Sequence, residues 1–445
     1  MLLYLNELFL SAGSIVKQRG TMQFIETFKK IFTLPDLRKK IIYALVILVI
    51  VRILAHIPLP GVDLTALQNF FSRNQYAGLL NMFSGGAMEN FSIIMMGVGP
   101  YITASIVMQL VTMIVPSLDE LNKEGEAGRA KITQWTRLLT VPLAILQSYS
   151  MVRLLQTQGL LANIAGWEWL NLLVFMTAGT ILLMWLGELI TENGIGNGVS
   201  LIIALGIIAG IPTQIRNTAF IVSASNIFTL ILFAAVAILV VVAIIIANEG
   251  TRQVPVSYAR RVRGLKAYGG IDTYLPIRVN SAGVIPIIFA MSIMLVPQVV
   301  GQFFRNARSE WLANASTWLL NVLTNNFIYG AVYFVLIVLF TYFYTGVVLK
   351  PDQMSENLQK QGGFIPGIRP GKETSVFLSG TISRLTLTGA VFLGLIAVLP
   401  FIMQGTTNIS TIAVGGTGVL IMVSVIIETM RQIQAQLSMR SYENY

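Results

Sequence analysis

Ten apolar runs, separated by polar and mostly basic segments, divide this chain of 445 residues. Crossing a bilayer as a helix takes about 20 apolar residues, and most of the runs approach that length. Hydrophobic residues make up 55% of the chain and charged residues only 11%, whereas soluble domains carry about 25% charge. The pattern predicts an all-α polytopic membrane protein. The expected spans cover about 41–55, 91–115, 138–155, 170–190, 200–212, 226–247, 279–297, 327–349, 376–403 and 412–427.

The second run has an unusual beginning. Residues 79–90 include Asn81, Ser84, Glu89 and Asn90, which lipid would not tolerate. Irregular backbone is stable at membrane depth only when it is buried in protein or lines a watery cavity. We therefore expect a short half-helix that folds back and plugs a cavity, followed by a full helix that forms the cavity wall.

The basic residues are distributed unevenly along the chain. The two tails and alternate loops hold 23 of the 30 Lys and Arg residues. Since cytosolic loops are enriched in Lys and Arg, both termini and the long loops 249–278 and 350–375 are expected in the cytosol. The net charge of +10 then reflects the orientation of the chain in the membrane. No specific recognition of nucleic-acid sequences is expected. Ten spans divide into two halves of five. If the second half repeats the first, the two halves must have opposite orientations in the membrane, because each has an odd number of spans.

The start of the chain predicts two segments. Residues 1–21 fit a signal peptide poorly, because no basic flank and no small-residue cleavage site are present. We expect them to be an extension or a mis-chosen start. Residues 24–40 combine apolar positions at helical spacing with basic ones, which predicts an amphipathic helix at the headgroup surface on the cytosolic side.

The residues that catalysis or cofactor binding would need are scarce. The chain has no Cys and a single His, His56, which excludes disulfides, thiolate sites and multi-His metal centres. The glycine-rich segment 194–198 follows a predicted helix rather than a strand, so it favours a tight turn over a dinucleotide site. The acidic residues of the spans, Glu188 and Glu428, lie near cytosolic ends, whereas ion-coupled carriers keep such groups near the midplane. We expect neither an enzyme nor a cofactor.

Two features remain as candidates for function. The basic cytosolic loops are either solvated surface or a docking site for a large anionic partner such as a ribosome. The glycines and prolines inside the second and seventh spans are either packing kinks or two walls of one opening.

Several of these stretches together resemble the SecY family, the central subunits of bacterial protein-conducting channels. The matching stretches are 57–61, 81–87, 125–128, 185–188, 190–198, 279–286 and 356–371. They extend over essentially the whole chain, with only 1–21 outside the pattern. The resemblance implies two inverted five-helix halves, 41–224 and 225–430, that form a clamshell around an hourglass pore. Cytosolic tails would cover 1–40 and 431–445.

The resemblance also implies the parts of the pore. Its constriction would be an apolar ring, in which Val98 replaces the family's usual Ile: Val98, Ile102, Ile203, Ile288 and Ile421. A plug would close the outer side: Met82, Phe83, Ser84, Gly85, Gly86, Ala87, Met88, Glu89, Asn90 and Phe91. A lateral gate between spans two and three and spans seven and eight would release apolar segments into lipid. Its polar latch would be Thr103, Gln147 and Asn280.

The implied partners act from the cytosol and within the bacterial cytoplasmic membrane. Arg260, Arg261, Arg263 and Arg369 match positions that engage the motor ATPase SecA or the ribosome. SecA would supply the ATP hydrolysis, SecE would brace the clamshell and SecG would be a third subunit. The substrates would be signal sequences and nascent or unfolded polypeptides.

Two other classes stay open at this point. A secondary transporter of a small solute would need a compact polar site at the midplane, which the sequence does not offer. An insertion scaffold without a pore would conduct no ions even after deletion of the plug.

Overall fold

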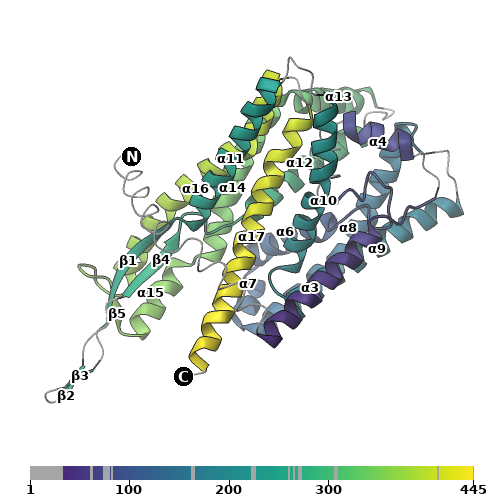
Figure 1. Ribbon diagram of the computed structural model, residues 1–445. Helices are drawn as coiled ribbons and strands as arrows, with labels where there is room; N and C mark the ends of the chain where they lie inside the picture. Colours follow the sequence, from purple (N-terminus) through teal and green to yellow (C-terminus); the bar gives the residue numbers. More distant parts are fainter. Residues whose placement is uncertain are drawn as a thin grey trace.

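The computed structural model describes residues 34–60, 64–73, 81, 84–161, 166–221, 227–258, 261–263, 266–268, 273–304, 309–407 and 410–443. These residues form a helical bundle with a small β-structured region at one end (Figure 1). Residues 1–33 lie outside the described part, and so do Met82, Phe83 and Arg260. The predicted extension and most of the predicted surface helix therefore fall outside it.

Each predicted span has a helix in the structure. These helices are α3 (Pro35–Leu54), α6 (Gly99–Ile114), α8 (Glu126–Thr157), α9 (Trp167–Asn193), α10 (Gly198–Ile221), α11 (Ile227–Glu249), α12 (Ile285–Phe304), α14 (Asn326–Val348), α16 (Lys372–Thr407) and α17 (Ser410–Glu443). Shorter helices lie between them: α4 (Leu64–Arg73), α7 (Pro116–Lys123), α13 (Glu310–Thr324) and α15 (Pro351–Lys360).

Length and hydropathy alone identify fewer spans. Within the described residues, five helices are long and apolar enough to cross a membrane, or six if α6 and α7 form one broken span. A membrane protein is thus supported, while the number of ten spans stays a prediction.

The polar segment 117–137, which separates the second and third expected spans and reads as a loop in the sequence, is helical, because α7 and the first turns of α8 occupy it. Val115 leaves the helical conformation before Pro116, and α6 and α7 meet at 102°. Gly125, with φ of +89°, separates α7 from α8. A Cβ on Gly128 would lie 1.7 Å from the carbonyl oxygen of Leu121, so only glycine fits this corner. Polar composition indicated exposure here, but Glu, Leu, Lys and Ala also favour helix.

The two long loops contain strands that the sequence did not predict. In the first loop, β1 (Thr251–Tyr258) pairs with β4 (Thr273–Arg278), and β2 (Arg261–Arg263) pairs with β3 (Lys266–Tyr268). In the second loop, β5 (Gly363–Phe364) adds to β1, which gives the antiparallel order β4-β1-β5. The two long loops therefore meet in one shared sheet.

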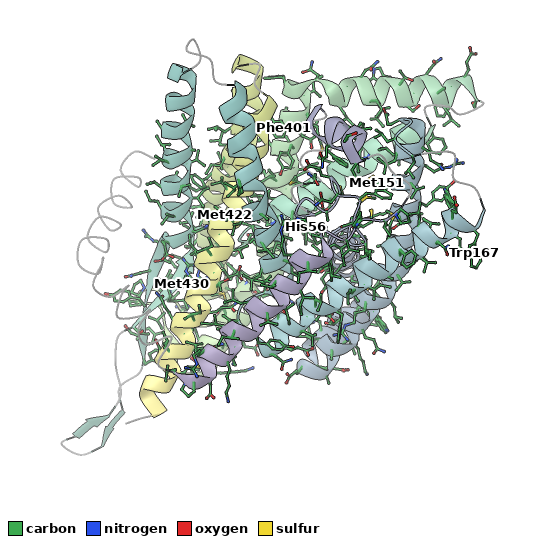
Figure 2. The ribbon with its side chains drawn as sticks, turned by 45° about the vertical axis from the view of Figure 1, so that its right-hand side comes forward. His56, Met151, Trp167, Phe401, Met422 and Met430 are labelled. Atoms are coloured by element: carbon green, nitrogen blue, oxygen red, sulfur yellow. The ribbon has the colours of Figure 1, made fainter. Side chains whose placement is uncertain are left out.

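The two largest apolar clusters of the described residues fill the bundle; Figure 2 labels Phe401 of the larger one and Met151, which packs against the smaller one. The larger one draws on α3, α9, α10, α11, α12, α13, α14, α16 and α17. The smaller one joins α4 to the ends of α8 and α9 and to the segment before α6. That segment contributes Ala87 to the larger cluster and Met88 and Phe91 to the smaller, so it packs between them.

Candidate functional site

The predicted plug is a chain of turns rather than the expected half-helix. The described residues 84–98 form successive turns, and α6 begins only at Gly99. Phe91 has a left-handed φ of +45°, and main-chain hydrogen bonds on either side of Ser92 tie the segment to the end of α3. Leu59 N donates to Phe91 O over 2.8 Å, and Ile93 N donates to Ile57 O over 3.2 Å. Gly85 and Gly86 disfavour a helix here because glycine loses more conformational freedom than other residues. The strand-like pairing disfavours it as well, because it uses main-chain groups that a helix would pair internally.

The polar side chains of the plug are satisfied by the protein. Asn81 Nδ2 donates to Glu89 Oε2 over 2.8 Å, and Glu89 N donates to Asn81 Oδ1 over 2.9 Å. Ser84 Oγ donates to Asn81 O, and Asn90 Nδ2 donates to Ala55 O. The prediction that these residues face protein rather than lipid is confirmed for the described ones, since all four are half-buried and hydrogen-bonded.

Arg52 links α3 to the plug. Its Nη1 donates to Gly85 O over 2.6 Å, and both residues line one cavity together with Val98 and Gly206. Gly85 has φ of +72°, and a Cβ there would lie 2.9 Å from the Cα of Gly206 on α10. The predicted plug segment therefore contacts a charged side chain of α3 on one side and the backbone of α10 on the other. Sequence reasoning missed this role, although an Arg inside an apolar run was a signal for it.

The five predicted ring residues belong to the larger apolar cluster or pack against it. Val98 precedes α6, Ile203 lies on α10, Ile288 on α12 and Ile421 on α17, and all four are buried in the larger apolar cluster. Ile102 on α6 is partly buried and packs against the same cluster. Ile421 and Ile203 are only 0% and 1% exposed. If these residues form the predicted ring, it is filled by packed side chains in this structure.

The three predicted latch residues do not share one network. Gln147 Nε2 on α8 donates to Thr103 Oγ1 on α6 over 3.4 Å. Asn280 instead donates through Nδ2 to Asn248 Oδ1 over 2.7 Å, and Asn248 donates to Ser424 Oγ over 2.7 Å. Asn280 is thereby fixed to α11 and α17 within the second half of the chain. Asn248 and Ser424 are 176 residues apart, so the sequence held no local signal for this pairing.

Three of the four predicted basic residues, Arg261, Arg263 and Arg369, are described and lie on the β-structured region. Arg261 and Arg263 are on β2, whose hairpin with β3 projects beyond the β4-β1-β5 sheet (Figure 1). Arg369 follows β5, and its side chain is exposed. Because β5 pairs with β1, both basic loops belong to one surface.

An ion pair joins the two halves near the β-structured end. Lys350, between α14 and α15, lies 3.5 Å from Asp119 on α7, and Lys123 contacts the same carboxylate at 2.7 Å. The side-chain hydrogen bond from Lys123 is the largest cause that holds the pKa of Asp119 below its usual value.

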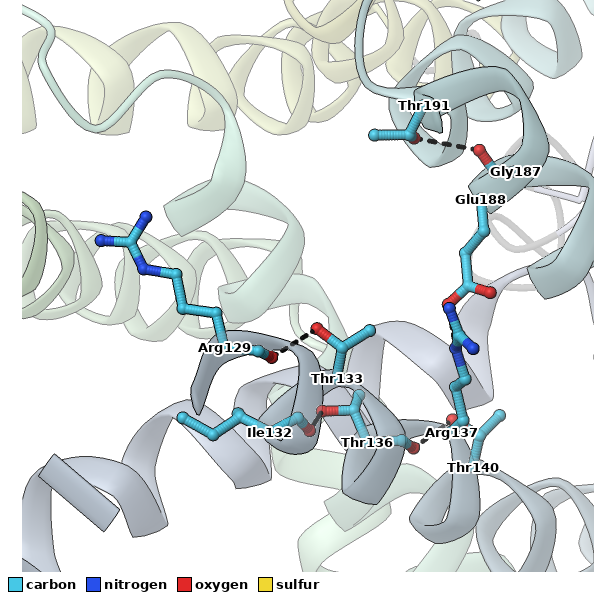
Figure 3. A network of polar contacts seen from close by, with 9 residues as sticks. All are labelled: Arg129, Ile132, Thr133, Thr136, Arg137, Thr140, Gly187, Glu188 and Thr191. Carbon is cyan, nitrogen blue, oxygen red and sulfur yellow. Dashed lines mark hydrogen bonds and ion pairs between the residues drawn. The ribbon is translucent and has the colours of Figure 1, made fainter. Parts of the chain in front are cut away.

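A second ion pair lies within the first half. Arg137 Nε on α8 contacts Glu188 Oε1 on α9 at 2.7 Å (Figure 3). Three residues on, Thr191 Oγ1 donates to Gly187 O and accepts from Gly198 N. A Cβ on Gly198 would lie 1.9 Å from Gly187 O. These contacts explain why a tight glycine turn separates α9 from α10, and they confirm that interpretation of the motif.

Comparisons with known proteins agree on one family. The SecY family model matches residues 92–430. "Protein translocase subunit SecY" of Mycobacterium tuberculosis (strain ATCC 25618 / H37Rv) is 42% identical over 433 residues, which cover 92% of this chain and 97% of the relative. The protein of the same name from Halalkalibacterium halodurans is 43% identical over 435 residues, 94% of this chain and 99% of the relative.

Solved structures share the fold. One described as a protein-conducting channel superposes with a TM-score of 0.62 at 19% identity and covers 89% of this chain and 92% of its own. A Sec61 structure from a canine ribosome-channel complex gives a TM-score of 0.56 at 17% identity, with coverage of 89% and 92%.

Proposed function

Because the chain belongs to the SecY family, we propose that it is the channel subunit of a protein translocase, a passive gated pore for unfolded polypeptides. The observation that carries the proposal is that four of the five predicted ring residues are buried in one apolar cluster and Ile102 packs against it, together with Ala87 of the predicted plug. An apolar constriction excludes water and ions, yet its flexible side chains can close around a passing chain. The ring and the plug then act in series as a seal.

Release into lipid would use the boundary between α6 and α8 on one side and α12 and α14 on the other. The side-chain contact from Gln147 to Thr103 supports this assignment, because it lies on the α6–α8 wall of that boundary. Hydrogen bonds between helices in lipid are worth roughly 0.6–2 kcal/mol. A signal sequence that inserts between the helices can replace such a weak interaction.

The driving force would come from partners that bind the basic surface of Arg261, Arg263 and Arg369. Arg residues attract anionic partners electrostatically. We assign this surface to the motor ATPase SecA and to the ribosome, which would exclude each other there because they share it. ATP hydrolysis would belong to SecA, while SecE would brace the clamshell and SecG would be a third subunit.

The proposed placement is the bacterial cytoplasmic membrane, with both termini in the cytosol. The two inverted halves are 41–224 and 225–430, and the cytosolic tails are 1–40 and 431–445. The excess of Lys and Arg in the tails and in alternate loops supports this orientation.

The test is reconstitution of the purified chain with its translocase partners in lipid vesicles. With SecA and ATP, a secretory polypeptide should become protected from added protease, and a SecA variant that cannot hydrolyse ATP should abolish the protection. Equal protection with that variant, or uptake of a small solute without any polypeptide substrate, would contradict a motor-driven polypeptide channel.

A further inference from the structure

Helix α13 lies crosswise to the long helices at the end of the bundle away from the β-sheet (Figures 1 and 2). It is joined to α14 through Asn325 alone, whose Oδ1 accepts from Phe327 N over 3.0 Å and caps α14. Since α14 lies in a segment apolar and long enough to cross a membrane, its first residue marks the depth at which that crossing begins. The end of α13 is therefore fixed at the membrane–water boundary.

One face of α13 packs onto the bundle. Leu323 is buried in the larger apolar cluster and Leu319 packs against it. A Cβ on Gly301 of α12 would lie 2.9 Å from Leu320 Cγ, so α12 and α13 are in close contact. The movement of α13 is consequently coupled to that of α12, a wall of the proposed gate.

The opposite face presents two tryptophans to the surroundings. Trp311 and Trp318 are 74% and 67% exposed, and their spacing of seven places them on the same side of the helix. At 3.6 residues per turn, Ala315 and Val322 lie on one flank of this pair. Exposed polar residues lie on the other flank: Asn314, Thr317 and Asn321. The two rings thus mark a boundary between an apolar and a polar strip.

The exposed apolar surface continues from α13 onto α14. Phe327 is 83% exposed, and further down α14 Val335 and Leu339 are also exposed. On a helix that crosses a membrane, such a stripe faces lipid. Tryptophan is enriched at the headgroup level, where an apolar ring meets a polar edge.

We propose that α13 is an interfacial helix whose outer face binds the glycerophospholipid headgroup region of the leaflet opposite the β-sheet. Ala315 faces the acyl chains, Asn314 faces water, and Trp311 and Trp318 lie between them. The lipid surface thereby holds the end of α12. This inference requires that α14 spans the membrane, but it does not depend on channel activity.

The test uses the absence of cysteine from the chain. Ala315→Cys and Asn314→Cys, each carrying a nitroxide label in proteoliposomes, form a matched pair one residue apart. The Ala315 label should be relaxed mainly by oxygen, which concentrates in lipid, and the Asn314 label mainly by a water-soluble nickel complex. A label at Val335→Cys on α14 serves as the lipid-facing reference.

Other outcomes would overturn the proposal. Relaxation of both α13 labels by the nickel complex would show that the helix stands in water. Protection of both labels from both reagents would show that protein covers this face. Translocation by the labelled variants, measured in parallel, separates a failure of this inference from a failure of the proposed function.

Discussion

The guanidinium of Arg52 donates a hydrogen bond of 2.6 Å to the main-chain carbonyl oxygen of Gly85. This bond joins α3 to the plug, next to the cavity that Val98 also lines. Hydrogen bonds to charged groups contribute about 1.5–3 kcal/mol. The contact is therefore strong enough to shift the equilibrium between the closed and the displaced position of the predicted plug.

Replacement of Arg52 by Met should favour the displaced position of the predicted plug. Met retains much of the apolar stem but cannot donate, so the closed state loses this bond. Loss of about 1.5–3 kcal/mol corresponds to a roughly 10- to 100-fold larger open fraction. Ion conductance in planar bilayers should rise accordingly, and a conductance equal to that of the unmodified chain would remove Arg52 from the seal.

Gly85 and Gly86 offer a matched comparison that tests the contact between the predicted plug and Gly206 of α10. Both have left-handed φ values, +72° and +78°, but a Cβ on Gly85 meets Gly206 Cα at 2.9 Å whereas one on Gly86 meets nothing within 4 Å. Alanine costs about 1–2 kcal/mol in that conformation at either position. Only Gly85→Ala adds a clash with α10. The ion conductance of this variant should therefore exceed that of Gly86→Ala. Equal leak from the two variants would mean that the plug does not rest on Gly206.

The ion pair from Asp119 to Lys350 should restrain the gate, because it joins α7 to the end of α14. Asp119→Asn and Lys350→Gln should each increase export of a substrate with a weakened signal sequence. The double variant should add little to either single one, since both remove the same contact. The control is Lys360→Gln, which breaks a pair with Glu356 inside α15. An equal effect of the control would point to surface charge in general.

The same pair should respond to acid. The hydrogen bond from Lys123 lowers the pKa of Asp119, so the contribution of the carboxylate is present at neutral pH and is lost as the pH falls through that lowered pKa. The effect of Asp119→Asn on export should therefore disappear at acidic pH. A difference that persists after protonation would assign the effect to the shape of the side chain.

Arg369→Glu should block export driven by SecA while the protein remains inserted, because a carboxylate repels an anionic partner at the site where the two basic loops meet. Lys372→Glu, an exposed position at the start of α16, changes the net charge equally and should retain more activity. Export and sedimentation with vesicle-bound SecA would be measured together. Normal export by the Arg369 variant would take this loop out of the mechanism.

The apolar helices could be predicted from the sequence, because hydropathy is a local signal, whereas the ring positions rest on the family resemblance and stay a prediction. The helical structure of 117–137 and the β-sheet of the two long loops could not be predicted in the same way. In those segments, polar residues compatible with several conformations are ordered by tertiary contacts, as when Phe364 pairs with Ser257.

Contacts between distant side chains were the least predictable part. Asn280 was expected to join Thr103 and Gln147, but in the structure it binds Asn248, which in turn binds Ser424. An amide can serve many partners, and packing decides which of them is within reach. Arg52 is the exception, because a charge within an apolar helix needs a partner, and the sequence therefore indicated that one exists.

The central claim is that a polypeptide passes through the ring. The direct measurement is cross-linking of a stalled translocating chain to single cysteines, which the cysteine-free sequence permits. Ile203→Cys and Ile421→Cys in the ring should form cross-links, whereas Val335→Cys on the exposed face of α14 should not. Cross-links from Val335 without any from the two ring positions would contradict the account.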